Sequence, residues 1–143
     1  MVIYLYGPDS YRRNEKLRAL VAAYHAKHAV ADLIDVDLEE DAEGWIKVRA
    51  FLSQPSMFVA SKVAVVREGA AASERGWINI LKGNLAVPST FVILSDREEP
   101  PRPFGFLLEP PAQCQAFAAL SGAPLAAFVA REAAARGVRF EEP

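Results

Sequence analysis

Residues 2–9 read Val2-Ile3-Tyr4-Leu5-Tyr6-Gly7-Pro8-Asp9, an apolar run that ends in a turn. A helical pattern follows, because apolar residues recur at i, i+3, i+4 and i+7 at Leu17, Leu20, Val21 and Tyr24. A short apolar strand followed by an amphipathic helix is the first half of a βαβ unit. This opening therefore predicts an α/β domain.

The same alternation continues along the chain. Further strand-length apolar runs cover residues 33–38, 63–66, 90–94 and, less clearly, 113–117. The helical patterns between and after them are carried by Trp45, Val48 and Leu52, by Trp77, Ile80 and Leu81, and by Leu125, Phe128 and Val129, all expected to face inward. We therefore predict an α/β fold with a five-stranded, mainly parallel sheet and helices on both faces.

Two local signals refine this outline. Asp41 and Ser73 precede the second and third helical patterns and are candidate N-caps. The proline-rich stretch 98–111 predicts a stiff surface loop around a short turn at residues 104–108.

Composition limits the classes of function. The chain has 143 residues, of which 52% are hydrophobic, which suits one folded domain. Its net charge of −2 gives no general attraction to nucleic acid or to an anionic membrane. Cys114 is the only cysteine, expected to be a small buried residue, and a reducing compartment fits this count. The N-terminus has no signal peptide or membrane span, so a cytoplasmic protein with no membrane partner is the default expectation.

The first strand-to-helix loop is where an open α/β sheet usually binds its ligand. Aligned with the phosphate-loop pattern G-x-x-x-x-G-K-[ST], Gly7 takes the first position, Arg12 replaces the second glycine and Arg13 replaces the lysine. Asn14 replaces the residue whose hydroxyl binds magnesium, and Asp9 adds negative charge where phosphate would lie. This degenerate phosphate loop argues against nucleotide hydrolysis, and we expect no catalytic residue, metal or cofactor.

In an alternative interpretation, the domain still binds a nucleotide. Arg13 could contact a phosphate, and Glu68 could lie near a metal at the end of the apolar run 63–66, giving a nucleotide-binding switch or an enzyme with an unusual loop. However, Arg67 comes directly after that run, and a cation there opposes magnesium.

Two other groups of residues are explained better by their place in the fold than by a chemical role. Asp35 and Asp37 could receive a phosphoryl group, as in a receiver-like signalling domain, but their alternation with apolar residues suits an edge strand with one solvated face. His25 and His28 could form a metal pair, although a solvated helix end explains them better.

The connection between the second helical pattern and the run 63–66 contains the best candidate for an exposed binding site. Pro55 stops the helix, and Met57 and Phe58 follow at the tip of the connection. Adjacent large apolar residues on a loop suit a protein-binding site. In the alternative interpretation, Phe58 or Val59 folds back into the core.

The order of these features resembles the N-terminal domain of the delta subunit of the bacterial DNA polymerase III clamp loader. The similarity rests on Ile3-Tyr4-Leu5-Tyr6-Gly7-Pro8-Asp9, on Leu52-Ser53 with Ser56-Met57-Phe58, on Lys62-Val63-Ala64-Val65-Val66-Arg67, on Thr90-Phe91-Val92-Ile93-Leu94 and on the last helix leading to Arg136-Gly137-Val138. It covers essentially the whole chain. The resemblance implies a degenerate phosphate-loop NTPase-like fold of the AAA+ class, in a subunit that does not hydrolyse ATP.

The resemblance also implies a function. Met57 and Phe58 align with the family's hydrophobic pair, which enters a pocket of the ring-shaped sliding clamp (beta) and promotes ring opening during DNA replication; Ser56 and Val59 flank this clamp-binding pair. Other clamp-loader subunits (gamma or tau, and delta prime) are implied partners through further domains. No activity is expected from this chain alone, although the parent holoenzyme is a DNA-directed DNA polymerase.

Departures from the family limit what is carried over. The resemblance implies that residues 1–143 are the ATPase-like domain I of a longer delta subunit, without its lid and collar domains. The proline-rich stretch 100–111 replaces a polar, lysine-containing helix, so contact with primer-template DNA is expected only indirectly.

Overall fold

A five-stranded parallel sheet forms the centre of the structure, a computed structural model that describes residues 1–28, 31–55 and 61–137. The elements, in chain order, are β1 (Val2–Tyr6), α1 (Ser10–Lys27), β2 (Ala31–Asp37), α2 (Gly44–Ser53), β3 (Ser61–Arg67), the short 3-10 helix η1 (Gly69–Ala71), α3 (Arg75–Asn84), β4 (Thr90–Asp96), the 3-10 helix η2 (Arg102–Leu108), β5 (Gln113–Ala116) and α4 (Gly122–Ala135). The strand order is β2-β3-β4-β1-β5, and every neighbouring pair is parallel. The predicted fold class is confirmed.

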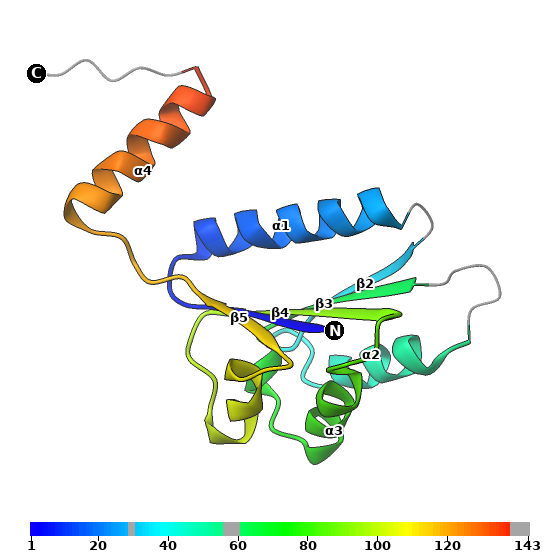
Figure 1. The fold of residues 1–143 in the computed structure, drawn as a ribbon. Coiled ribbons are helices and arrows are strands. Elements are labelled where there is room, and N and C mark those ends of the chain that lie inside the picture. Colours follow the sequence, from blue (N-terminus) through cyan, green and yellow to red (C-terminus); the bar gives the residue numbers. More distant parts are fainter. Residues whose placement is uncertain (29–30, 56–60, 138–143) are drawn as a thin grey trace, which may run out of the picture.

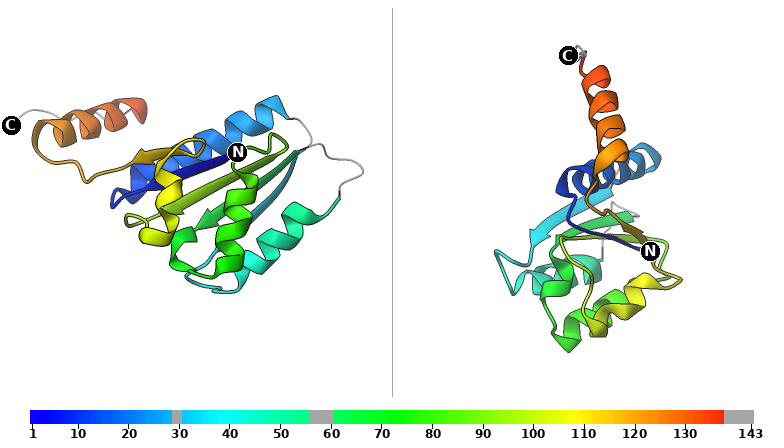
Figure 2. Two further views of the ribbon diagram at one scale, coloured as in Figure 1. Left: turned by 60° about the horizontal axis from the view of Figure 1, so that its bottom comes forward. Right: turned by 90° about the vertical axis from the view of Figure 1, so that its left-hand side faces the viewer.

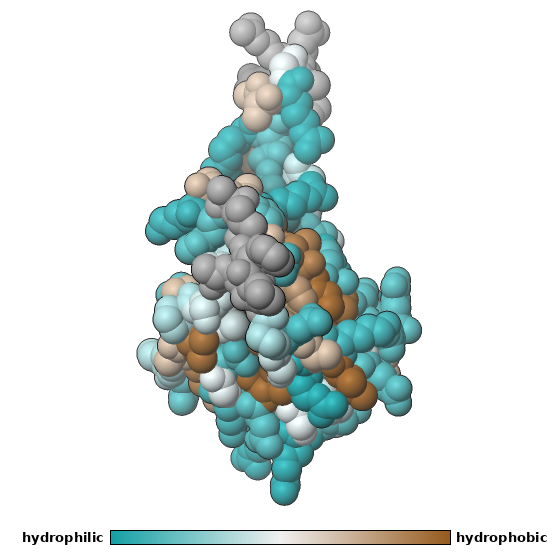
Figure 3. Space-filling view, turned by 90° about the vertical axis from the view of Figure 1, so that its right-hand side faces the viewer, coloured by the Kyte–Doolittle hydropathy of each residue, from teal (hydrophilic) through white to brown (hydrophobic). Residues whose placement is uncertain are grey.

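Helices cover both faces of the sheet, as the periodicity predicts. α1 packs on one face through Leu17 and its neighbours, while α2, α3 and η2 lie on the other (Figures 1 and 2). Val48 in α2 and Trp77 and Leu81 in α3 are fully buried, because each lies on the apolar stripe of its helix. On the side shown in Figure 3, the apolar surface of the described residues lies in small areas among hydrophilic side chains, which is what an enclosed core predicts.

Strand burial follows position in the sheet. The central strands β3 and β4 are almost wholly buried, whereas β2 and β5 are edge strands with exposed residues. The interpretation of Asp35 and Asp37 as residues of an edge strand is confirmed. Cys114 lies on β5 and is exposed, so its expected burial is wrong; an edge strand leaves its side chains open to solvent.

The last helix departs most from expectation. α4 extends away from the sheet instead of covering it (Figure 1), and none of its residues is buried. Leu125 and Val129 are 43% and 42% exposed, so the prediction that they face inward is wrong. α4 meets α1 only at a local cluster in which the rings of Tyr11 and Phe128 pack edge to face at 5.8 Å.

Smaller corrections concern caps and the proline-rich stretch. The N-caps of α2 and α3 are Glu43 and Glu74, not Asp41 and Ser73; Asp41 instead accepts the Glu43 N–H in the turn before α2. The expected turn at residues 104–108 lies within η2, but η2 is more than a surface loop, because Phe104 and Leu107 are fully buried in the core.

Candidate functional site

The loop between β1 and α1 lies at the carboxyl ends of the strands, where a phosphate loop would bind its ligand. Gly7 has φ of +128°, a conformation that favours glycine. A Cβ on Gly7 would lie 2.3 Å from the carbonyl oxygen of Phe117, which follows β5. The loop is therefore packed against the chain after β5 with no room for a side chain.

The backbone amides of this loop already have partners within the protein. Gly7 N–H donates to the Asp96 carbonyl at 3.1 Å, and Asp9 N–H donates to the Phe117 carbonyl at 3.1 Å. The Asp9 carboxylate caps α1, because its Oδ1 accepts the Arg12 N–H at 3.1 Å. A working phosphate loop needs such amides free to point at phosphate, so this loop lacks the donors that its chain position suggests.

Both loop arginines are also held within the protein. Arg13 is buried, and its guanidinium donates from Nε to Ser95 Oγ at 3.0 Å and from Nη1 to the Gly7 carbonyl. Burial lowers the pKa of Arg13, although Glu68 and Asp96 nearby oppose that change. Arg13 thus fills the interior beside the loop, and the alternative in which it contacts a phosphate gains no support.

Arg12 lies closer to the surface. Its Nε pairs with Asp9 Oδ2 at 2.6 Å, and its Nη2 donates to the Ala118 carbonyl at 2.8 Å. Asp9 and Arg12 therefore join the start of α1 to the chain after β5.

A second polar group, around Asp96, lies at the carboxyl ends of β3 and β4. Asp96 is 4% exposed and accepts hydrogen bonds from Gly69 N–H at 2.7 Å, Ala70 N–H at 2.9 Å and Tyr4 Oη at 3.1 Å. Burial raises the pKa of Asp96 to about 6, although the two backbone N–H groups act to lower it. The same burial, together with the Asp96 charge, raises the pKa of Tyr4.

Asp96 is a candidate-site residue that the sequence patterns do not single out. The expected position of an acid, after β3, is occupied by Arg67 and Glu68, whereas the buried acid is the last residue of β4. The sequence signal was available, since Asp96 follows the apolar run 90–94 by two residues. Its side chain nevertheless acts structurally here, because it caps η1 and is satisfied by protein donors.

An acidic hollow of about 420 Å³ opens beside Asp96, with Glu39 and Glu68 among its lining residues. Glu68 does not stand free for a metal: its Oε1 pairs with Arg97 Nε at 3.2 Å, and Arg97 also pairs with Glu39. Within the described ranges, no group of three or more His, Cys, Asp or Glu side chains could hold a metal ion. The alternative with Glu68 near a metal gains no support.

The remaining candidates are dispersed. Asp35 pairs with Arg67 on the α1 face of the sheet, and Asp37 Oδ1 accepts the Glu39 N–H. His25 and His28 are exposed at the end of α1, where the His28 ring lies 4.5 Å from the ring of Tyr24. These residues do not converge on one site.

The proposed clamp-binding residues Ser56, Met57, Phe58 and Val59 lie outside the described residues. Lys62, on the β3 side of this connection, is largely buried. Its Nζ donates to the carbonyls of Phe51, at 2.6 Å, and Gln54. Lys62 therefore ties the end of α2 to the start of β3.

The fold resembles that of solved structures, although the sequence matches no family model. No protein-family model and no curated protein sequence matches the chain. Among solved structures, the DNA clamp loader delta protein of Bacillus subtilis matches with a TM-score of 0.58 and 17% identity, over 94% of this chain and 43% of its own. The chain has a clamp-loader-like fold. At 17% identity this likeness establishes the fold.

A second solved structure is also similar to this chain. The DNA polymerase III gamma subunit-related protein of Thermotoga maritima matches with a TM-score of 0.46 and 14% identity, over 92% of this chain and 45% of its own. This chain spans less than half of the length of the Bacillus subtilis protein, 43%. None of the helices in the described part of the chain is long and apolar enough to span a membrane.

Proposed function

We propose that this chain is the ATPase-like domain I of a clamp-loader subunit, which binds a sliding clamp and promotes its opening without hydrolysing ATP. The observation that carries the proposal is the clamp-loader-like fold combined with a β1–α1 loop whose amides and arginines are engaged by the protein itself. A domain with this fold and no free phosphate loop suits a role in protein binding better than one in nucleotide chemistry.

The contact with the clamp is assigned to Met57 and Phe58, flanked by Ser56 and Val59. This assignment rests on sequence: two large apolar residues follow Pro55 in the connection between α2 and β3. The described contacts of Lys62 with the Phe51 and Gln54 carbonyls hold the end of α2 beside the start of β3, the two elements that flank that connection.

The mechanism is differential binding. A protein that binds the open clamp more tightly than the closed one shifts the clamp toward the open state by the difference in binding free energy. Two apolar anchors in a pocket can contribute roughly 2 to 4 kcal/mol each, which is enough to bias a weak ring interface. Methionine in place of leucine nearly conserves volume in such an anchor.

Surface plasmon resonance with an immobilised bacterial sliding clamp tests the assignment. The double variant Met57→Ala, Phe58→Ala should lose at least about 30-fold in affinity, the factor that corresponds to one 2 kcal/mol anchor. Ile46→Ala is the matched control, since Ile46 is an exposed apolar residue of α2, and it should bind as the unchanged chain does. Equal affinity of the double variant and the unchanged chain would remove the assignment.

We also propose that this domain is part of a longer protein. Lid and collar domains, beyond residues 1–143, would assemble this domain with other clamp-loader subunits (gamma or tau, and delta prime), in the cytoplasm, and would bring it near primer-template DNA. Co-purification of the full-length gene product with those subunits tests this part separately from clamp binding.

A further inference from the structure

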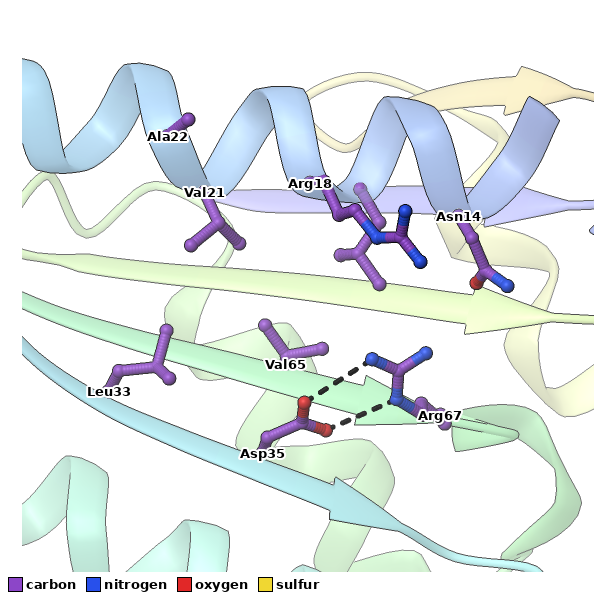
Figure 4. Close-up of a pocket in the computed structure, with 9 residues that line it drawn as sticks. Asn14, Arg18, Val21, Ala22, Leu33, Asp35, Val65 and Arg67 are labelled. Carbon is purple, nitrogen blue, oxygen red and sulfur yellow. Dashed lines mark hydrogen bonds and ion pairs between the residues drawn. The ribbon is translucent and has the colours of Figure 1, made fainter. Parts of the chain in front are cut away.

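A groove of about 350 Å³ lies on the α1 face of the sheet, between α1 and the strands β2 and β3 (Figure 4). It exists because α1 packs over β1 and β4, and no other helix within the described ranges covers the sheet on that side (Figures 1 and 2). Leu33 of β2 is consequently 45% exposed although it lies on a strand of the sheet. All of its lining residues come from α1, β2 and β3.

The floor of the groove is apolar. Leu33 and Val65 point into it from the sheet, and Val21 points into it from α1 (Figure 4). A half-exposed leucine beside two valines is a suitable contact for one aliphatic side chain of a partner, since anchor residues of protein interfaces fill apolar pockets of this kind.

The end of the groove near the carboxyl ends of the strands is cationic. The guanidinium groups of Arg18 and Arg67 and the amide of Asn14 lie around it (Figure 4). Asp35 is paired with Arg67, with both N–O distances at 3.3 Å in an exposed position, and such pairs are weak. No ion pair of Arg18 with a carboxylate is found within the described part of the chain.

The apolar floor and the cationic end of the groove together indicate the chemistry of its ligand. Two guanidinium groups facing one carboxylate leave a local excess of positive charge, and arginine matches the geometry of an incoming carboxylate. We propose that the groove binds an acidic-hydrophobic peptide segment of a partner protein, in which an aliphatic side chain contacts Leu33 and Val65 and a neighbouring carboxylate pairs with Arg18 and Arg67. This site is independent of the proposed clamp contact.

Nuclear magnetic resonance titration of the labelled chain tests the proposal. The probe is the peptide acetyl-Gly-Leu-Glu-Gly-amide, compared with acetyl-Gly-Leu-Lys-Gly-amide and acetyl-Gly-Ser-Glu-Gly-amide. The Leu-Glu peptide should shift the signals of Leu33, Val65 and the Arg18 side chain and saturate at a Kd of about 1 mM, the range of a single small anchor. The other two peptides should bind at least several-fold more weakly, and added salt should weaken Leu-Glu binding.

Variants separate the site from general surface binding. Arg18→Glu and Leu33→Ser replace exposed side chains, so the fold should persist, and each should weaken Leu-Glu binding about tenfold. Arg75→Glu and Leu108→Ser change an exposed arginine and an exposed leucine elsewhere and should leave it unchanged. Equal binding of the Leu-Lys peptide, or no shifts at about 10 mM Leu-Glu peptide, overturns the proposal; neither result bears on the sliding clamp.

Discussion

Arg13 donates a hydrogen bond from Nε to Ser95 Oγ at 3.0 Å, which joins the first turn of α1 to the end of β4 across 82 residues of sequence. The same guanidinium bonds the Gly7 carbonyl. A cation at the chain position of the phosphate-loop lysine thus acts as an internal crosslink of the loop.

Replacing Arg13 by alanine should lower the free energy of unfolding by about 2–3 kcal/mol, because buried acceptors lose a charged donor. Urea unfolding measures this loss. Arg12→Ala is the control and should cost less, since Arg12 is more exposed. Neither the unchanged chain nor the Arg13 variant should bind Mg-ATP in isothermal titration, and micromolar binding by either would contradict the interpretation of the loop.

Gly7→Ala should destabilise the fold severely, by more than about 2 kcal/mol. Two causes act together: the positive φ of Gly7 disfavours any side chain, and the new Cβ would clash with the Phe117 carbonyl. Gly105→Ala is the matched control, because a Cβ there has no heavy atom within 4 Å. The measurement is the midpoint of thermal unfolding of the two variants. Similar midpoints would contradict the close packing of Gly7 against the Phe117 carbonyl.

Asp96 should make stability depend on pH in a defined direction. Its pKa is raised to about 6 in the folded state, against about 3.9 in an unfolded chain, so the folded state binds this proton more tightly. Its contribution to stability therefore increases as pH falls from about 7 to about 4, by up to about 3 kcal/mol.

The variant Asp96→Asn isolates this contribution, because asparagine does not titrate. The difference in unfolding free energy between the unchanged chain and the variant should change across pH 4 to 7.5 in the stated direction, as measured by urea unfolding at each pH. Parallel curves for the two proteins would mean that the Asp96 pKa is not raised.

Lys62→Met should loosen the end of α2. The methionine keeps most of the side-chain length but leaves the Phe51 and Gln54 carbonyls without their charged donor, at a cost of about 1–3 kcal/mol. Hydrogen exchange should become faster in the last turn of α2. Lys47→Met, at an exposed ion pair with Asp41, serves as the control, and equal effects of both variants would argue against a special role for Lys62.

Tyr11 should set the orientation of α4. Its Oη donates to Glu132 at 2.9 Å and accepts from Arg136, and few other contacts hold α4 to the core. In a Cys114→Ser background, spin labels on α1 and α4, at Ala22→Cys and Ala135→Cys, should give a broader distance distribution after Tyr11→Phe. Glu40→Gln, an exposed change elsewhere, should leave the distribution as it was, and an unchanged Tyr11→Phe distribution would contradict the prediction.

Much of the fold could be predicted because burial leaves a periodic record in the sequence. Short apolar runs mark the five strands, and residues such as Leu17, Val48 and Trp77 mark the inward faces of α1, α2 and α3. The same method failed for α4, because the spacing of Leu125 and Val129 shows that a helix face is apolar but not what that face contacts.

The candidate sites are harder to predict from the sequence than the fold. Alignment with the phosphate-loop pattern identified Arg13 as a substitution, but its hydrogen bond to Ser95 depends on β4 lying beside β1. Asp96 was missed because its burial depends on η1, which brings two N–H groups to its carboxylate. The groove beside Leu33 depends on where α1 crosses the sheet, which no local pattern specifies.

Local sequence specifies the α/β alternation, the degenerate phosphate loop and the apolar pair Met57-Phe58, because these are properties of neighbouring residues. The internal crosslink through Arg13, the buried Asp96 with its raised pKa and the open groove that Leu33 lines with Arg18 and Arg67 follow from the three-dimensional arrangement. Strand order and helix placement bring together groups that are far apart in the chain, and the burial and charge of these groups then set what each can do.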